Sequence, residues 1–313
     1  MNITDKVAVC SRSFSANPLL RSELLARYQN VTFNDAGVVL EGDTLVSFLR
    51  GHDKAITALE RIDEYMLSRL PELKVIGKYG VGLDMIDFSA MRRHGKRLGW
   101  TGGVNRRAVS ELALSLAIAM LRHVPLANRE VLSGTWRQHV GGLLSGRTIG
   151  IIGCGHVGKD LVRLLQPFNC RIFVNDIRSY AKFYAEFSIE AVKLNELLVS
   201  ADVVTLHVPL DESTRNILSE DRLSLMKPHT ILINTARGGL VDEGALKRAL
   251  LDKRLAAAAF DVFVDEPPQD LELINLKNFL ATPHIGGSSE EAILAMGKAA
   301  IEGLDKSEIP HEL

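Results

Sequence analysis

The chain of 313 residues has little cysteine, no excess of either charge and no long apolar run. Its three cysteines, Cys10, Cys154 and Cys170, form neither a disulfide framework nor a metal-ligand spacing, so we expect reduced thiols, a cytoplasmic location and no bound metal. Lysine plus arginine number 37 and aspartate plus glutamate number 38. This balance provides no electrostatic attraction to nucleic acid or to an anionic membrane, and we expect neither as a partner.

The N-terminal segment lacks the long apolar stretch after a basic start that a signal peptide needs. The longest apolar helical candidate, residues 112–121, is half the roughly 20 residues that span a bilayer. Hydrophobic residues make up 46% of the chain and charged residues 24%, which is typical of a globular protein. At roughly 150 residues per domain, the length predicts two domains.

What the chain does contain is a regular alternation of short apolar runs with helical patterns, which predicts parallel α/β sheets. In the first hundred residues, we expect strands at 7–10, 45–49 and 74–79 and helices at 18–28 and 56–70. A long helix over 105–122 follows. This helix is apolar almost all round, which is typical of burial between two layers or in a subunit interface.

A second alternating series begins near Arg147. Its expected strands are 147–153, 171–176, 202–208, 230–236, 256–263 and 279–284, and its expected helices are 156–168, 241–254 and 288–306. The two series predict two doubly wound domains that meet near residues 100–105.

The run Gly153-Cys154-Gly155-His156-Val157-Gly158 follows an apolar strand and opens a helix with the spacing G-x-G-x-x-G. Gly153 permits a tight turn, Gly155 lets the backbone approach a pyrophosphate, and Gly158 lets the helix pack closely on the strand. The helix N-terminus offers free N–H groups to phosphates. Asp176, which ends the next strand, can bind the ribose hydroxyls and favours NAD over NADP. An S-adenosylmethionine site and a glycine turn that binds nothing are the open alternatives.

Three polar segments, 234–239, 261–267 and 282–287, follow strand candidates of the second series. Because ligands bind outside the carboxyl ends of such strands, we expect Arg237, Glu266 and His284 to converge. Arginine can clamp a carboxylate, and histidine can exchange a proton with a carbonyl oxygen. A carboxylate beside the histidine would favour the imidazolium form. The simpler alternatives are that Arg237 is a capping residue, that Glu266 is a turn carboxylate and that His284 is a structural histidine.

Taken together, these segments resemble the D-isomer-specific 2-hydroxyacid dehydrogenase family, and within it phosphoglycerate dehydrogenases that lack a C-terminal regulatory domain. The resemblance is carried by KYGVGLDMID (78–87), VNRRAVSELAL (104–114), LSGRTIGIIGCGHVGK (144–159), LHVPLDEST (206–214), MKPHTILINTARGGLVDEGAL (226–246), FDVFVDEPP (260–268) and TPHIGG (282–287). It implies an α/β fold of two doubly wound parallel-sheet domains. A Rossmann cofactor domain, 102–284, would be inserted into a smaller flavodoxin-like substrate domain, 1–101 and 285–313.

The resemblance also assigns roles to individual residues. It implies that Arg237 binds the substrate carboxylate and carbonyl, that Glu266 and His284 form the acid–base pair, and that the amides of Val81 and Gly82 bind the carboxylate. Asp261 would contact the nicotinamide amide. Further cofactor contacts are implied at His156, Val157, Val208, Thr235, Ala236 and Gly287. The family is usually dimeric, packing around the helix at 105–122, with the substrate in a cleft between the domains.

The substrate is less well defined than the chemistry. Arg50, placed after the expected strand 45–49, matches an arginine that holds the distal phosphate in phosphoglycerate dehydrogenases, and Lys78 could add to an anion pocket. We therefore expect NAD-dependent oxidation of D-3-phosphoglycerate or a related acid, with glyoxylate, hydroxypyruvate, lactate and sugar acids left open. Surface cations without a ligand are the alternative for Arg50 and Lys78. Met85 and the run Trp100–Gly103 depart from the family pattern.

A function of another class also stays open at this point. Corepressors that resemble this family use NADH to set dimerisation and partner binding. A homodimeric, NADH-sensing interaction protein is therefore the alternative to an oxidoreductase.

Overall fold

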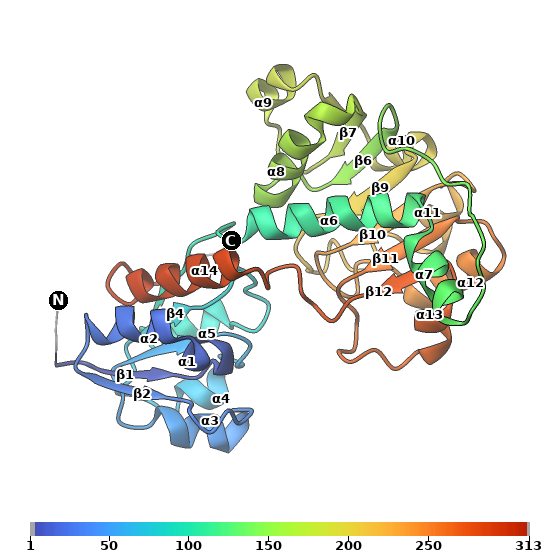
Figure 1. Cartoon of the computed structure of the whole chain (residues 1–313). Helices are drawn as coiled ribbons and strands as arrows, with labels where there is room; N and C mark the ends of the chain where they lie inside the picture. The colour runs from blue at the N-terminus through green and yellow to red at the C-terminus, as the bar shows by residue number, and fades with distance from the viewer. Residues whose placement is uncertain (1–3, 312–313) are drawn as a thin grey trace. The chain divides into compact units, whose positions relative to one another are not determined.

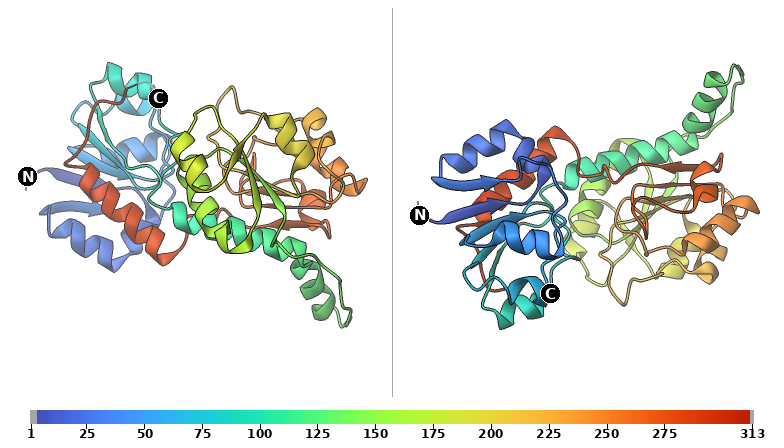
Figure 2. Two further views of the ribbon diagram at one scale, coloured as in Figure 1. Left: turned by 90° about the horizontal axis from the view of Figure 1, so that it is seen from above. Right: turned by 90° about the horizontal axis from the view of Figure 1, so that it is seen from below.

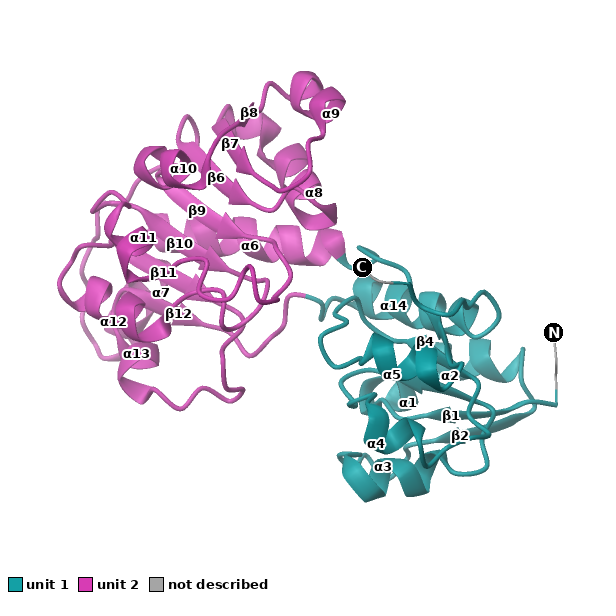
Figure 3. Cartoon of the chain, turned by 180° about the vertical axis from the view of Figure 1, so that it is seen from behind, with its two compact units in different colours: residues 1–105, 287–313 teal, residues 106–286 magenta. Residues whose placement is uncertain are grey.

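The structure is a computed structural model that describes residues 4–311. Contacts divide the chain into two compact units, unit 1 (Met1–Asn105 and Gly287–Leu313) and unit 2 (Arg106–Gly286), coloured teal and magenta in Figure 3. The chain crosses from one unit to the other twice, within a few residues of the crossings expected at 101–102 and 284–285.

Unit 1 is built on a five-stranded sheet in the order β2-β1-β3-β4-β5. The strands are β1 (Lys6–Val9), β2 (Asn30–Phe33), β3 (Lys54–Thr57), β4 (Val75–Lys78) and β5 (Arg97–Gly99). Every neighbouring pair is parallel. This is the flavodoxin-like order of a doubly wound sheet, so the fold class expected for the first domain is confirmed.

Helices cover both faces of the unit 1 sheet (Figure 1). One face carries α1 (Arg12–Ala16), α2 (Pro18–Leu25) and α14 (Glu290–Gly303), and the other carries α3 (Gly42–Leu49), α4 (Glu64–Leu67) and α5 (Phe88–Arg93). Helix α14 lies so close to β5 that a Cβ on Gly99 would sit 2.0 Å from the carbonyl oxygen of Gly303. The last helix of the chain therefore completes the first unit.

Two expectations for unit 1 are wrong. The predicted strand at 45–49 is part of helix α3, because the Thr44 hydroxyl accepts the Glu41 N–H at the helix start and Leu45, Val46 and Leu49 share its buried face. The predicted helix at 56–70 begins instead with the end of strand β3 and leaves only the short helix α4. Short apolar runs fit either period, and tertiary contacts decide between them.

Unit 2 is built on a seven-stranded parallel sheet in the order β12-β11-β10-β9-β6-β7-β8. The strands are β6 (Thr148–Ile152), β7 (Arg171–Asn175), β8 (Glu190–Ala191), β9 (Val203–Leu206), β10 (Ile231–Asn234), β11 (Ala257–Phe260) and β12 (Phe279–Ala281). The strand order reverses between β6 and β9, as in the Rossmann fold, so this part of the predicted fold class is also confirmed.

The helices of unit 2 form two layers around its sheet. Helices α6 (Arg106–Leu121), α8 (His156–Leu165) and α9 (Ala181–Glu186) pack on one face, and α10 (Leu194–Ser200), α11 (Glu220–Ser224), α12 (Glu243–Leu251) and α13 (Leu271–Asn275) pack on the other. A single 3-10 turn, Gln166–Phe168, extends α8. The long helix α6 lies against α8, β10 and β11 (Figure 1).

Helix α7 (Val124–Leu132) differs from the others because none of its residues is buried. It stands clear of the layers of unit 2, together with the segment that follows it (Figure 2). Large apolar side chains in this arm are exposed, namely Val131, Leu132, Trp136, Val140 and Leu143. Among residues 4–311, no single helix is long and apolar enough to cross a membrane, and α6 with α7 meet that criterion only as a pair bent by 64°.

Candidate active site

The glycine turn lies between β6 and α8, where the strand order of unit 2 reverses. Gly153 has a φ of +95°, and a Cβ there would lie 2.6 Å from the carbonyl oxygen of His207. A Cβ on Gly158 would lie 2.2 Å from the carbonyl oxygen of Gly153. Only glycine fits these two positions, whereas a Cβ on Gly155 would meet nothing within 4 Å. The turn is therefore tightly packed on one side and open at Gly155.

Asp176 follows β7 and lies against the same turn. Its carboxylate accepts the N–H of Cys154 at 2.6 Å and the N–H of Arg178 at 2.7 Å. These two bonds fix the acidic group beside the open glycine turn, which is where the ribose of a dinucleotide would need an acceptor. Cys154, which lies between Gly153 and Gly155 in the turn, is buried. Burial raises the pKa of its thiol to about 11, so the thiol stays protonated.

Two further features of this edge fit NAD. The ten-residue helix α8 has Gly155 at its N-cap and no side-chain cap, which leaves its first N–H groups for phosphate oxygens. The buried hydroxyl of Thr235 has no hydrogen-bond partner in the structure. The other residues expected to line the cofactor from unit 2 also follow the carboxyl ends of β6, β9 and β10, namely His156, Val157, Val208 and Ala236.

His284 and Glu266, the residues expected to act as an acid–base pair, lie in contact. The Nδ1 atom of His284 lies 2.8 Å from Oε2 of Glu266, and both side chains are partly exposed, at 44% and 41%. The second oxygen of Glu266 accepts the N–H of Phe263 at 3.1 Å. Because Nδ1 faces the carboxylate, Nε2 is the ring nitrogen left for proton exchange with a ligand.

Asp261 organises the segment that carries His284. It is buried, and its carboxylate accepts the Thr282 hydroxyl at 2.6 Å and the N–H groups of Ile285 and Gly286 at 2.8 and 2.7 Å. The backbone of His284 has a φ of 53°, an uncommon conformation for a residue with a side chain. These bonds hold that backbone in place. The nicotinamide contact of Asp261 stays a prediction.

Arg237 lies in the turn after β10, next in the sheet to β11, which precedes the Glu266 loop. The Asn234 amide donates to the Arg237 carbonyl oxygen at 2.8 Å, and the Arg237 guanidinium donates to the Ala236 carbonyl at 2.7 Å. A Cβ on Gly238 would lie 1.9 Å from the carbonyl oxygen of Phe263, so the arginine turn packs directly on the Glu266 loop. The turns after β10, β11 and β12 thus bring the three predicted catalytic residues to one edge of unit 2.

A family model described as the NAD binding domain of D-isomer specific 2-hydroxyacid dehydrogenases matches residues 114–286. A glyoxylate reductase from Thermococcus litoralis is 35% identical over 282 residues, which cover 86% of this chain and 85% of that protein. The chain belongs to this family. The family is one of NAD-dependent oxidoreductases, so the predicted enzyme class and cofactor are confirmed.

Relatives with different names share this similarity. A D-3-phosphoglycerate dehydrogenase from Methanocaldococcus jannaschii is 38% identical over 249 residues, but the chain spans only 48% of its length. Among solved structures, a glyoxylate reductase from Paecilomyes thermophila has a TM-score of 0.86 at 25% identity and covers 98% of this chain and 95% of its own. The two-domain fold is therefore shared over nearly the whole chain.

The substrate residues expected in unit 1 lie after β4. Val81 and Gly82 are partly buried, and the Trp100 indole donates to the Val81 carbonyl oxygen at 3.1 Å. Trp100, one of the departures from the family pattern, thus fixes the loop that was expected to bind the carboxylate. Lys78 ends β4, is 3% exposed and donates to the Ala58 carbonyl. The buried Thr57 hydroxyl, without a hydrogen-bond partner, lies in register with Lys78.

Arg50 lies elsewhere. It ends helix α3 and precedes β3, so it belongs to the amino ends of the unit 1 strands, whereas Val81 and Gly82 follow a carboxyl end. The neighbouring Gly51 N–H donates to Glu72, and this bond, with a smaller contribution from Arg50, lowers the pKa of that carboxyl. The placement of Arg50 after a strand was wrong, and its expected role toward a distal phosphate loses its structural basis.

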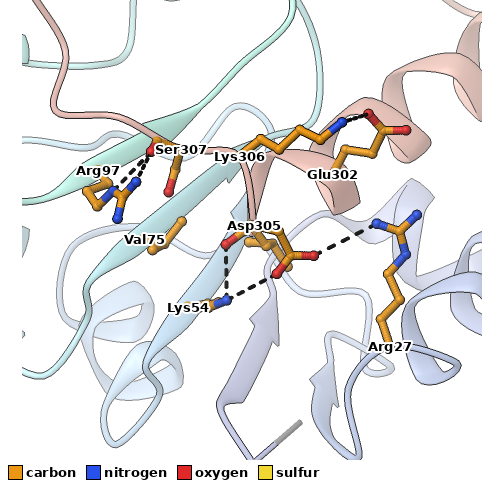
Figure 4. Close-up of a pocket in the computed structure, with 9 residues that line it drawn as sticks. Arg27, Lys54, Val75, Arg97, Glu302, Asp305, Lys306 and Ser307 are labelled. Atoms are coloured by element: carbon orange, nitrogen blue, oxygen red, sulfur yellow. Dashed lines mark hydrogen bonds and ion pairs between the residues drawn. The ribbon is translucent and has the colours of Figure 1, made fainter. Parts of the chain in front are cut away.

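A separate cavity of about 630 Å³ also lies at the amino ends of unit 1 (Figure 4). Lys54 in this cavity pairs with Asp305, Arg97 donates to the Ser307 carbonyl oxygen, and Lys306 pairs with Glu302. Its cations are thus engaged with groups of the same unit, on the edge away from Val81. Gly287, the remaining predicted cofactor residue, lies in unit 1 beside Asn105. Its contact with cofactor stays a prediction.

Proposed function

We propose that this protein interconverts a 2-keto acid and a D-2-hydroxy acid with NAD(H), and that glyoxylate and hydroxypyruvate are its preferred keto acids. The observation that carries the proposal is the 2.8 Å contact between His284 and Glu266 on the edge that also presents Arg237 and the glycine turn. Relatives named glyoxylate reductase and hydroxypyruvate reductase match over 84–88% of their own lengths.

His284 exchanges the proton. In reduction, the imidazolium donates its Nε2 proton to the substrate carbonyl oxygen, which becomes the hydroxyl, and in oxidation the neutral ring takes it back. Glu266 faces Nδ1, so its negative charge favours the imidazolium and its hydrogen bond fixes the orientation of the ring. NAD(H), when bound, supplies or takes the hydride at the substrate carbon.

Arg237 orients the substrate. A planar guanidinium can bind a carboxylate through two parallel hydrogen bonds and can also polarise the neighbouring carbonyl oxygen. The turn that carries Arg237 packs on the Glu266 loop through Gly238, which supports a fixed distance between the carboxylate clamp and the proton donor. In this proposal, unit 2 is the cofactor domain and unit 1 is the substrate domain, with the Val81 and Gly82 amides binding the carboxylate.

D-3-Phosphoglycerate is the second candidate substrate. The observation in its favour is Lys78, a buried cation at the carboxyl end of β4, four residues before Gly82. Lys78 can serve a distal anion only if its ammonium turns from the Ala58 carbonyl toward the substrate. Because Arg50 lies at the other end of the strands, D-3-phosphoglycerate as the substrate is now supported by Lys78 alone.

The test is a comparison of hydroxypyruvate with its 3-phosphorylated form and with glyoxylate. We expect NADH oxidation with all three and the highest kcat/KM for an unphosphorylated acid. A preference for the phosphorylated acid that disappears in Lys78→Met would replace the first candidate with the second. Absence of NADH oxidation with any 2-keto acid, together with tight NADH binding, would favour the NADH-sensing interaction protein instead.

The exposed arm formed by α7 and residues 133–143 supports the proposal of a homodimer. Five large apolar side chains of this arm, residues 131, 132, 136, 140 and 143, are at least half exposed, and a gathering of this kind is typical of a protein interaction site. The three cysteines are free thiols, which supports a cytoplasmic location.

A further inference from the structure

The carboxylate of Glu243 lies in the first turn of α12, directly behind the loop that carries Glu266. Its Oε1 atom accepts the N–H of Val264 at 2.9 Å. An acidic residue at this position usually interacts with the helix dipole. The start of α12 is already capped by Asp242, whose side chain accepts the Ala245 N–H at 2.9 Å. The Glu243 side chain is therefore available to reach out of its own helix to another loop.

Val264, whose N–H bonds to Glu243, lies in the loop that carries Glu266. Its neighbour Phe263 donates its N–H to Oε1 of Glu266 at 3.1 Å, and the other oxygen of Glu266 faces His284. Gly238, next to Arg237, packs on the same peptide, since a Cβ there would lie 2.4 Å from the Val264 nitrogen. The Phe263–Val264 peptide is thus held by Glu243 on one side and contacts the arginine turn on the other.

We infer that Glu243 is a positioning residue for the reaction, which fixes the loop so that Glu266 faces His284 and the loop keeps its packing against the arginine turn. The inference rests on the proposed function and does not make Glu243 a catalytic residue, because its hydrogen bond is to the backbone of Val264. What Glu243 supplies is an acceptor at a fixed distance, not a proton.

The side chain occupies a setting that suits this role. Burial and the nearby carboxylates Asp265 and Asp270 raise the pKa of Glu243, while the Val264 N–H opposes that shift. Both cations of the same helix are paired elsewhere, Lys247 with Asp270 and Glu272, and Arg248 with Glu220. Within residues 4–311 Glu243 forms no ion pair, so its interaction with the loop is the hydrogen bond to Val264.

The experiment compares Glu243→Gln, which keeps an acceptor at the same reach, with Glu243→Met, which keeps the length and removes it. We expect the Gln variant to retain kcat/KM within about threefold of the parent. In the Met variant, kcat should fall about 10- to 100-fold while the Kd for NADH stays within about threefold, because displacing a catalytic group by about 1 Å costs rates of this size. Glu220→Ala, which removes an exposed first-turn carboxylate from the neighbouring helix α11, should match the parent.

A second measurement separates positioning from general stability. In the Met variant, the NMR resonances of the His284 ring at a fixed pH should differ from those of the parent and the Gln variant, because Glu266 no longer faces the ring. If Met and Gln behave alike in rate and in these resonances, the inference is wrong. If the Met variant does not fold, Glu243→Asp, which withdraws the acceptor by one methylene, replaces it in the same comparison. A parent that reduces no keto acid would refute the proposed function, whereas the resonances of the His284 ring would still decide the role of Glu243.

Discussion

The role proposed for Arg237 depends on the shape of its side chain as well as on its charge. In Arg237→Lys the cation is kept, but the planar pair of donors that clamps a carboxylate is lost. We expect kcat/KM for the keto acid to fall on the order of 10²-fold or more, which corresponds to a few kcal/mol of transition-state binding. The Kd for NADH should change little, because the predicted phosphate site is at the glycine turn. Equal losses in both quantities would contradict a role in substrate binding.

Glu266 contacts His284, the residue proposed to exchange the proton. Reduction needs the imidazolium and should decline as pH rises, whereas oxidation needs the neutral ring and should decline as pH falls. Glu266→Gln removes the charge that favours the imidazolium, so both limbs of the pH–rate profile should move to lower pH. Profiles of kcat/KM in both directions measure this shift. A variant profile that superimposes on the parent would show that the 2.8 Å contact has no influence on proton transfer.

The residues of this edge differ in how far sequence alone could place them. Arg237, Glu266 and His284 each follow a strand, and parallel strands bring their carboxyl ends together, so their convergence was predictable. The bond from Val264 to Glu243 spans 21 residues and joins a helix start to a loop, and no local pattern indicates it. Arg50 was placed at the wrong edge of the unit 1 sheet because residues 45–49 were predicted as a strand. They are part of helix α3, so Arg50 lies at the amino ends of the strands and not at their carboxyl ends.

At the scale of elements, we expect the turn between β6 and α8 and the end of β7 to decide between NADH and NADPH. The Cys154 and Arg178 amides hold the Asp176 carboxylate in place, so a 2′-phosphate would meet a fixed like charge. Such a contact costs several kcal/mol, and we expect kcat/KM to favour NADH over NADPH on the order of 10²-fold. Asp176→Ser should reduce the preference for NADH over NADPH. Steady-state kinetics with both cofactors measure this preference. A parent kcat/KM with NADPH that equals or exceeds the value with NADH would reject Asp176 as the residue that selects NAD.

The elements themselves were predictable where length or a special residue removed ambiguity. Helix α6 and the glycine turn were found, because sixteen residues of apolar helix and three spaced glycines fit no other structure. Helix α3 was not, because a short run with four apolar residues in five, LVSFL (45–49), fits a strand as well as a buried helical face. The edge strand β2 has only partly buried or exposed residues and so lacks the apolar run that marked the inner strands.

At the scale of the whole chain, we expect one partly buried histidine to make stability depend on pH. His207 follows β9, is partly buried, and its desolvation lowers its pKa from 6.5 to about 3. The unfolded chain therefore binds a proton below about pH 6.5 that the folded chain refuses, so stability is lost as pH falls from there toward 3. The expected extra slope is up to about 1.4 kcal/mol per pH unit.

His207→Gln should remove this slope. Urea unfolding of parent and variant between pH 7 and 4 gives the free energy of unfolding at each pH. The comparison is between the slopes of this free energy against pH in the two proteins. Carboxylates whose pKa is lowered by hydrogen bonds and ion pairs, such as Asp202, lose stability with acid in both proteins and cancel in the comparison. Parallel lines for parent and variant would show that His207 takes up its proton without unfolding.

The exposed arm after α6 gives the last prediction, which concerns assembly. Leu132 and Trp136 are 79% and 87% exposed, on a helix and segment that bury nothing in their own unit. Two copies that covered each other's arms would remove this apolar surface from water, and the gain grows with the area buried. Sedimentation should therefore give the parent twice the 34.4 kDa chain mass. The double variant Leu132→Arg with Trp136→Ser should sediment as a single chain, because two charges would otherwise be buried in the interface. Leu59→Arg, at an equally exposed leucine of unit 1, should remain a dimer. A parent of single-chain mass, or a double variant with the parent's mass, would exclude the arm as the dimer contact.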